Sequence, residues 1–310
     1  MTALITTSSS LPAPTGITAD LFNRWISYID AKPKTVETYT RSIRHFVSYL
    51  ADRGITAPTR ADVIAYRDEL KTGHKPATVQ GYLAAVKTFF SWTAQEGIYQ
   101  NIADHVKGCR IEKGFKKDYL TTAQVKQLLS RIDRTTLKGM RDYAILALMI
   151  TTGLRTVEVA RANIEDMRPV GDFTAIYIQG KGRDQKAEYV KVAPPVEEAI
   201  RAYLKARGTA AATSPLFASI ANRNDGGRMT TRSISRIAKD NMIDADLISD
   251  RLTAHSLRHT AATLNLLNGG TVEETKQLLR HSKLDTTLIY AHALERAKNE
   301  SENRIAAAIF

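Results

Sequence analysis

The chain has 310 residues, a formal net charge of +12 and an isoelectric point of about 9.7. Its length suggests about two domains. Hydrophobic residues make up 43% of it, which is enough for real cores, but no run approaches the roughly 18 apolar residues of a membrane span. The basic excess favours a polyanionic partner, with nucleic acid ahead of an anionic membrane, because no basic amphipathic helix carries Trp or Phe on its other face.

The N-terminal segment and the single cysteine indicate the compartment. Residues 1–16 are rich in Ser, Thr and Pro, so we predict a disordered N-terminus. They lack the basic and apolar regions of a signal peptide. Cys109 cannot form an internal disulfide, and its isolation fits a reducing cytoplasm.

An all-helical domain is predicted over residues 17–106. Apolar residues recur at helical spacing from Thr18, and further helices are predicted over 35–50, 60–70 and 77–96. The predicted helix over 35–50 places Arg41 and Arg44 largely off its apolar face, so both are candidates for nucleic-acid contact.

A basic linker is predicted over residues 107–117. It contains two glycines and five basic residues. We expect it to touch phosphate through Lys113, Lys116 and Lys117. The alternative is a linker that is merely solvated. A second domain then occupies 118–310.

The second domain is predicted to be mainly α with a small β-hairpin or sheet. Helices are expected from residue 121 or 122, over 140–150, from 154, over 194–205, 231–239, 254–267 and 271–281, from 285, and at the C-terminus. Alternating residues 173–179 and 187–192 flank a basic tip, which predicts a hairpin. Lys181 and Arg183 lie at that tip.

The last sixty residues contain groups suited to phosphate chemistry. His255 and Arg258 are three residues apart on one predicted helix and share a face. Arginine grips two phosphate oxygens with a planar fork, and histidine transfers protons near neutral pH. His281 and Tyr290 follow on the next two helices. A phenol needs cationic neighbours to lose its proton, and we expect two arginines and a histidine to lower the pKa of Tyr290.

Three more candidates lie upstream. Arg155 follows Gly153 at a junction between helices, and Glu158 comes three residues later, where it could buttress Arg155 or a histidine. Lys181 could reach the nucleic acid and protonate a leaving oxygen. Each has a structural alternative, such as a helix cap for Arg155 or a solvated turn for Lys181. Their joint occurrence in this order favours a site that cuts and rejoins a nucleic-acid backbone.

The chain resembles the tyrosine recombinases, which include phage integrases and Xer-type proteins. The matching strings are Thr152–Glu158, Gly180–Gly182, His255–Thr260, and Leu279–His281 running on to Thr286–His292. They span about 140 residues of the catalytic half. The helical domain resembles the core-binding domain of that family, less specifically.

The resemblance implies a role for each residue. Tyr290 would be the nucleophile, and Arg155 and Arg258 would hold the non-bridging oxygens of the scissile phosphate. Lys181 would be the general acid for the 5′-oxygen. His255 would assist proton transfer, His281 would hydrogen-bond the phosphate and Glu158 would support the site. Preorganised cations would stabilise the transition state, so no metal, cofactor or ATP is expected.

The sequence departs from the family pattern at two places. Arg280 stands where the family often has glycine. The stretch 183–188 is longer than in compact Xer-type hairpins, and Glu188 falls near a usual arginine. Lys186 is therefore a fallback for Lys181. We assign packing or DNA-backbone roles to His259 and His292.

The resemblance also implies the assembly. Residues 305–310 look like an apolar plug after a polar stretch, so we expect a homo-tetramer on double-stranded DNA that exchanges its C-terminal helix, with packing within one chain as the alternative. The start of the helical domain near residue 17 predicts a two-domain enzyme without an arm-binding domain. A cytoplasmic, nucleoid-associated enzyme of a prokaryote or phage is expected, with a possible directionality factor.

Several biological roles stay open. An integrase of a mobile element is slightly favoured over an Xer-type dimer resolvase. A type IB topoisomerase and a DNA-binding relative that no longer cuts are further alternatives. The small helical domain and the C-terminal plug disfavour the topoisomerase, and the filled catalytic positions disfavour the inactive relative.

Overall fold

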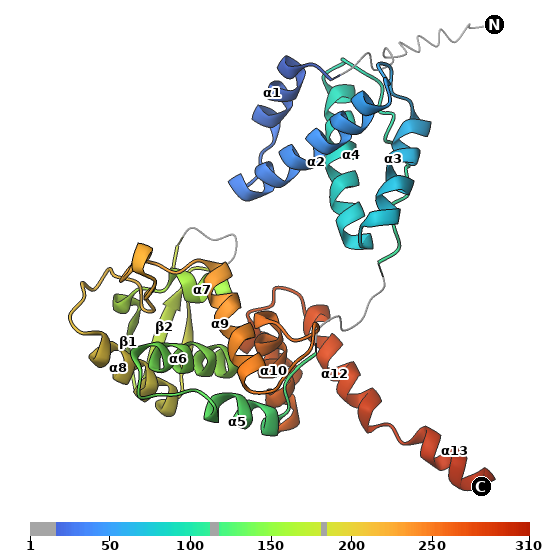
Figure 1. Ribbon diagram of the computed structural model, residues 1–310. Coiled ribbons are helices and arrows are strands. Elements are labelled where there is room, and N and C mark those ends of the chain that lie inside the picture. Colours follow the sequence, from blue (N-terminus) through green and yellow to red (C-terminus); the bar gives the residue numbers. More distant parts are fainter. Residues whose placement is uncertain (1–16, 112–117, 181–184) are drawn as a thin grey trace, which may run out of the picture. The chain divides into compact units, whose positions relative to one another are not determined.

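The chain forms two compact units, Met1–Lys113 and Gly114–Phe310. The computed structural model describes residues 17–111, 118–180 and 185–310 (Figure 1). The mainly helical fold with a small antiparallel sheet, predicted from the sequence, is confirmed. In the part of the chain described, no helix is long and apolar enough to cross a membrane.

Residues 17–111 of the first unit form four helices, and their shared core is rich in aromatic side chains. These are α1 (Ala19–Tyr28), α2 (Pro33–Asp52), α3 (Arg60–Gly73) and α4 (Pro76–Gln95). Helix α2 packs along α4, and Trp25, Phe46 and Phe89 are fully buried between the helices. The sequence pattern predicts that the second helix starts at Thr35, but it starts two residues earlier. Pro33 occupies its first turn, where the fixed backbone angle of proline suits a helix and its missing N–H costs nothing.

The basic candidates of this unit lie on its surface. Arg41 and Arg44 are exposed on α2, and the guanidinium of Arg44 lies 5.4 Å from the ring centre of Phe22. The start of the predicted linker is bonded to the unit, because the carbonyls of Lys107 and Cys109 accept hydrogen bonds from α3 and α4. Lys113, Lys116 and Lys117 lie outside the described residues.

The second unit is built around a buried helix. Helix α6 (Leu137–Thr152) is buried at every position from 144 to 150, and it packs on α8 (Pro194–Arg207) and α10 (Ala254–Leu267). The other helices in residues 118–180 and 185–310 are α5 (Thr122–Ser130), α7 (Thr156–Arg161), α9 (Thr231–Asp244), α11 (Val272–Leu279), α12 (Asp285–Lys298) and α13 (Ser301–Ile309). Short 3₁₀ turns occur at Ile164–Asp166 and Asn222–Asn224.

The sheet has one strand more than the predicted hairpin. Strands β2 (Phe173–Ile178) and β3 (Glu188–Val192) pair as expected, with Ile176 opposite Val190. Strand β1 (Met167–Val170) adds to the other side of β2. It was missed because Met-Arg-Pro-Val has no clear alternation, and because proline within a sheet is confined to edge strands, strand starts and bulges. There the guanidinium of Arg168 lies 3.8 Å from the ring centre of Tyr177.

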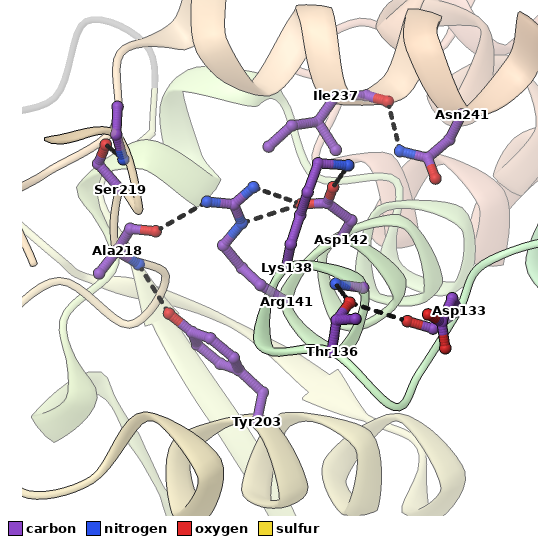
Figure 2. A network of polar contacts seen from close by, with 12 residues as sticks. Asp133, Thr136, Lys138, Arg141, Asp142, Tyr203, Ala218, Ser219, Ile237 and Asn241 are labelled. Atoms are coloured by element: carbon purple, nitrogen blue, oxygen red, sulfur yellow. Dashed lines mark hydrogen bonds and ion pairs between the residues drawn. The ribbon is translucent and has the colours of Figure 1, made fainter. Parts of the chain in front are cut away.

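A buried ion pair ties α6 to the loop before α9 (Figure 2). Arg141 donates two hydrogen bonds to one carboxylate oxygen of Asp142, at 2.9 and 2.7 Å, and a third to the carbonyl of Ala218 at 3.3 Å. The backbone N–H of Ala218 in turn donates to the hydroxyl of Tyr203 on α8, at 3.1 Å. Lys138 lies 3.2 Å from the other oxygen of Asp142. These contacts hold α6 in place, and the end of α6 leads into the candidate site.

Candidate active site

The junction between α6 and α7 places the first arginine. Gly153 ends α6 in the left-handed conformation (φ 62°), which suits glycine. A side-chain carbon there would lie 2.5 Å from the terminal methyl Cδ2 of Leu279, so any other residue would force that buried side chain to shift. The chain then turns into Arg155, the residue that precedes the first turn of α7.

Arg155 is fastened by Glu158. Its Nη1 donates to Oε1 of Glu158 at 2.8 Å, and its backbone N–H donates to Oε2 at 2.8 Å. The side chain of Glu158 is 1% exposed and that of Arg155 is 30% exposed, so the acid anchors a cation that still reaches solvent. Of the two partners expected for Glu158, Arg155 or a histidine, the carboxylate contacts Arg155.

Arg258 is the buried centre of the site. It lies on α10, its side chain donates to the backbone carbonyls of Gly153 and Leu279, and its residue exposure is 2%. Burial, followed by the charges of Arg155 and Arg280, lowers the pKa of Arg258 to about 9. His255, one turn earlier on α10, is exposed.

His281 is held in a neutral state by its surroundings. Its Nδ1 lies 2.9 Å from the hydroxyl of Thr287, which is fully buried on α12. Burial, then Arg258, Arg155 and Arg280, lowers the pKa of His281 to about 4. A neutral imidazole donates through one ring nitrogen and accepts through the other.

Tyr290 lies on α12 and is 5% exposed. Its ring centre is 5.3 Å from that of His259, which in turn lies 4.8 Å from that of His255. The predicted decrease in its pKa is wrong for the protein without DNA. Arg258 and Arg155 do act to lower the pKa of Tyr290, but burial raises it by more.

A cavity of about 540 Å³ opens at this place. It is lined by Arg155, His255 and Arg258, together with residues from α7, α9 and the segment before α10. Lys239 of α9, which the sequence did not single out, also lines the cavity and donates to the carbonyls of Ser249 and Leu252.

The hairpin contributes one described candidate. Lys181 and Arg183 lie outside the described residues. The fallback Lys186 is described, and its Nζ forms an ion pair with the buried carboxylate of Asp166. Within residues 17–111, 118–180 and 185–310, no three His, Cys, Asp or Glu side chains group as metal ligands would.

Sequence reasoning missed the contacts that depend on packing. Thr287, which holds His281, gave no distinctive spacing signal, and the sequence did not show that His259, expected to have a packing or DNA-backbone role, lies against Tyr290. Arg280 was noted only as an added charge, yet it donates to the same Glu158 that holds Arg155.

The family match is consistent with this geometry. Residues 118–296 match the model described as the phage integrase family, and residues 22–97 match the phage integrase N-terminal SAM-like domain. The chain belongs to the phage integrase family of tyrosine recombinases. Members of this family cleave and rejoin DNA without metal or ATP.

Individual relatives share a moderate sequence identity with this chain. A tyrosine recombinase XerC of Chlamydia caviae is 31% identical over 204 residues, covering 66% of this chain and 63% of the relative. The chain thus matches less than two thirds of that relative's length.

The fold is shared with solved recombinases. A structure of the XerH site-specific recombinase bound to difH substrate in a pre-cleavage complex superposes with a TM-score of 0.70 at 19% identity, covering 93% of this chain and 98% of that one. A lambda integrase tetramer bound to a Holliday junction gives 0.67 at 16% identity, covering 86% of this chain and 76% of that one.

The lowered pKa values of His259 and His281 predict that the stability of the fold depends on pH. Burial, then His255 and Arg258, lowers the pKa of His259 to about 4, as for His281. An unfolded histidine titrates near about 6.5. Between these values the unfolded chain binds more protons, so stability is full above about pH 6.5 and falls as the pH drops towards 4. After discounting for partial exposure, we expect His259→Asn and His281→Asn each to remove about 1 kcal/mol of the loss between pH 7 and 5 in urea unfolding.

The control is His105→Asn, at an exposed histidine of the other unit. It should leave the pH dependence as in the wild type. An unchanged loss in both active-site variants would contradict the assignment of neutral, buried imidazoles.

Proposed function

We propose that the chain is a site-specific tyrosine recombinase that cleaves and rejoins double-stranded DNA through a 3′-phosphotyrosyl intermediate on Tyr290. The observation that carries the proposal is the convergence of Arg155, His255 and Arg258 on one cavity, with Tyr290 on the helix packed against α10. The three lining residues come from α10 and from the start of α7, and the ring of His259 lies between those of Tyr290 and His255, at 5.3 and 4.8 Å.

The arginines supply the electrostatic part of catalysis. Arg155 and Arg258 hold the non-bridging oxygens of the scissile phosphate, where negative charge increases in the transition state. His281 adds a hydrogen bond as a neutral donor. Because these groups are already fixed by Glu158, by the carbonyls around Arg258 and by Thr287, little reorganisation accompanies the reaction.

Proton transfer is divided among three groups. Burial keeps the phenol of Tyr290 protonated before DNA binds, so its proton leaves as the oxygen attacks phosphorus, with His255 assisting. Lys181 protonates the departing 5′-oxygen, which gives a free 5′-hydroxyl. The phosphotyrosyl bond conserves the energy of the broken phosphodiester, so rejoining needs no ATP.

The rest of the chain binds DNA in this proposal. The helical domain, residues 17–106, contacts the duplex through Arg41 and Arg44, which are exposed. The linker 107–117 adds Lys113, Lys116 and Lys117, and the hairpin adds Arg183. The catalytic domain comprises 118–310. An enzyme of this kind works in the cytoplasm, on the nucleoid or on phage DNA.

The C-terminal helix is proposed to link protomers. Helix α13 has no buried residue, and Ile305, Ile309 and Phe310 are 60%, 69% and 102% exposed. Apolar side chains left in water at a helix end gain free energy when a neighbour covers them. A homo-tetramer on DNA that exchanges this helix fits that exposure, and the lambda integrase tetramer offers a parallel in the same fold.

Two biological roles compete. The long connection between β2 and β3, residues 179–187, favours an integrase of a mobile element or phage, with a directionality factor as a further partner. The similarity to XerC favours a resolvase of chromosome or plasmid dimers as the second candidate. Phage or transfer genes beside this gene would support the integrase.

The nucleophile is tested by covalent trapping. Nicked duplexes tiled across the region around the gene are offered to the protein, since cleavage next to a nick releases a short fragment and prevents rejoining. We expect a protein–DNA adduct on a denaturing gel, and none with Tyr290→Phe, because phenylalanine has no attacking oxygen. Tyr177→Phe, on the sheet, makes the same chemical change away from the cavity, so it serves as the matched control and should keep the adduct. An adduct with Tyr290→Phe would refute the assignment.

The general acid is tested with a sulfur-substituted substrate. A 5′-bridging phosphorothiolate needs no protonation of its leaving group, because a thiolate is a stable anion. We expect Lys181→Ala to slow cleavage of ordinary DNA about 100-fold or more and to regain most of the rate on the phosphorothiolate. Lys186→Ala should change neither rate strongly, since Lys186 is paired with Asp166. If the phosphorothiolate instead restores cleavage by a slowed Lys186→Ala variant, the general acid is Lys186.

Helix exchange is tested by truncation. Deleting residues 304–310 should abolish most recombination between two sites while leaving binding to one site close to wild type, because the lost contacts join protomers. Gel shift and a two-site recombination assay measure the two activities. Ile305→Ser is the milder variant and should weaken recombination in the same direction. Unchanged recombination after truncation would refute the proposed helix exchange and would indicate that the C-terminal helix packs within its own chain.

A further inference from the structure

Arg280 has an unusual backbone and an unusual environment. It ends α11 in the left-handed conformation, with φ 54° and ψ 47°, where L side chains are strained and glycine is favoured. Its side chain is 10% exposed, so the charge is largely withdrawn from water. A glycine would end the helix at lower cost and bury no charge, which means that the cap alone does not account for an arginine here.

The guanidinium of Arg280 is directed by two hydrogen bonds. Nη1 donates to the carbonyl of Leu278 at 2.8 Å, and Nη2 donates to Oε2 of Glu158 at 3.0 Å. Burial lowers the pKa of Arg280, and Glu158 and Glu188 act in the opposite direction. Arg280 is therefore linked through the carboxylate of Glu158 to Arg155.

Glu158 is shared between two arginines. Its Oε1 accepts from Nη1 of Arg155, and its Oε2 accepts from Arg280 and from the backbone N–H of Arg155. An arginine and a carboxylate without other partners tend to pair through two parallel hydrogen bonds. Arg280 occupies the oxygen that such a second bond from the side chain of Arg155 would use.

We propose that Arg280 is a positioning residue for Arg155: by occupying Oε2 of Glu158, it limits the side chain of Arg155 to one bond with Glu158 and leaves its other N–H groups directed at the DNA phosphate. This rests on the proposed function. Arg280 acts through Glu158 and does not touch the substrate.

The charge balance agrees with this role. Glu158 alone would neutralise one of the two phosphate-binding arginines. With Arg280 as its second partner, the acid is satisfied, and Arg155 and Arg258 keep more of their positive potential for the phosphate. The charge of Arg280 also contributes to the field around the site, as the lowered pKa of Arg258 reflects.

The test compares Arg280→Gly, Arg280→Met and Arg280→Lys in single-turnover cleavage of the nicked duplex at saturating protein. The glycine variant removes the guanidinium while relieving the backbone, and the methionine variant keeps bulk without charge. We expect both to slow cleavage on the order of 10-fold or more with DNA affinity close to wild type, since a small misplacement of a catalytic group carries such a cost. The lysine variant should recover part of the rate. Wild-type cleavage by the glycine variant would overturn the inference, because it would show that the residue serves only as a cap.

A double-mutant comparison tests the route of the effect. In a Glu158→Gln background, Arg280→Met should cause little further loss, because the carboxylate through which Arg280 acts is gone. The same fold-loss in both backgrounds would show that Arg280 acts independently of Glu158 and would overturn the inference.

A structural measurement separates this inference from the proposed function. A crystal structure of Arg280→Gly should show the side chain of Arg155 bonded to both oxygens of Glu158. An unchanged Arg155 would overturn the positioning role whatever the cleavage assay gives. A wild-type protein that forms no adduct would refute the recombinase proposal, and the crystal structure would still decide the role of Arg280.

Discussion

The site depends on one buried arginine that binds two backbone carbonyls. Arg258 joins the end of α6 at Gly153 to the end of α11 at Leu279, and it does so from α10. These two ends carry Arg155 and His281 respectively, so a single guanidinium sets their separation. Removing the Arg258 side chain would take away the hydrogen bonds to the carbonyls of Gly153 and Leu279, which would destabilise the packing of α6, α10 and α11.

A second constraint is the crowding of like charges. Three guanidinium groups lie near one carboxylate, that of Glu158, and burial makes their repulsion stronger than it would be in water. The phosphate that the protein is proposed to bind would supply the negative charge that offsets the repulsion among these guanidinium groups. Burial, followed by the charges of the same arginines, lowers the pKa of His281 and keeps it neutral. Burial keeps Tyr290 protonated until DNA arrives.

Local patterns predicted most helices and the order of the site residues. Helix α10 has the bounds expected from its sequence, and the Thr-x-x-Glu start of α11 forms the capping box that its spacing indicates. Strand β1 was missed, because its residues pair for reasons of tertiary packing and lack the alternation of a strand. The pKa of Tyr290 was predicted in the wrong direction, because the neighbouring charges can be guessed from a motif but the degree of burial cannot.

The sequence by itself determined which chemical groups are present and, through its family motifs, that they belong to a tyrosine recombinase. Spacing of three residues also placed His255 with Arg258 and Arg155 with Glu158, since such spacing is a neighbour relation within a helix turn. Only the tertiary structure decided that Arg280 shares Glu158 with Arg155, that Thr287 holds His281 and that Lys186 is paired with Asp166. Those contacts join residues on separate elements, and their distances follow from packing, which no local periodicity encodes.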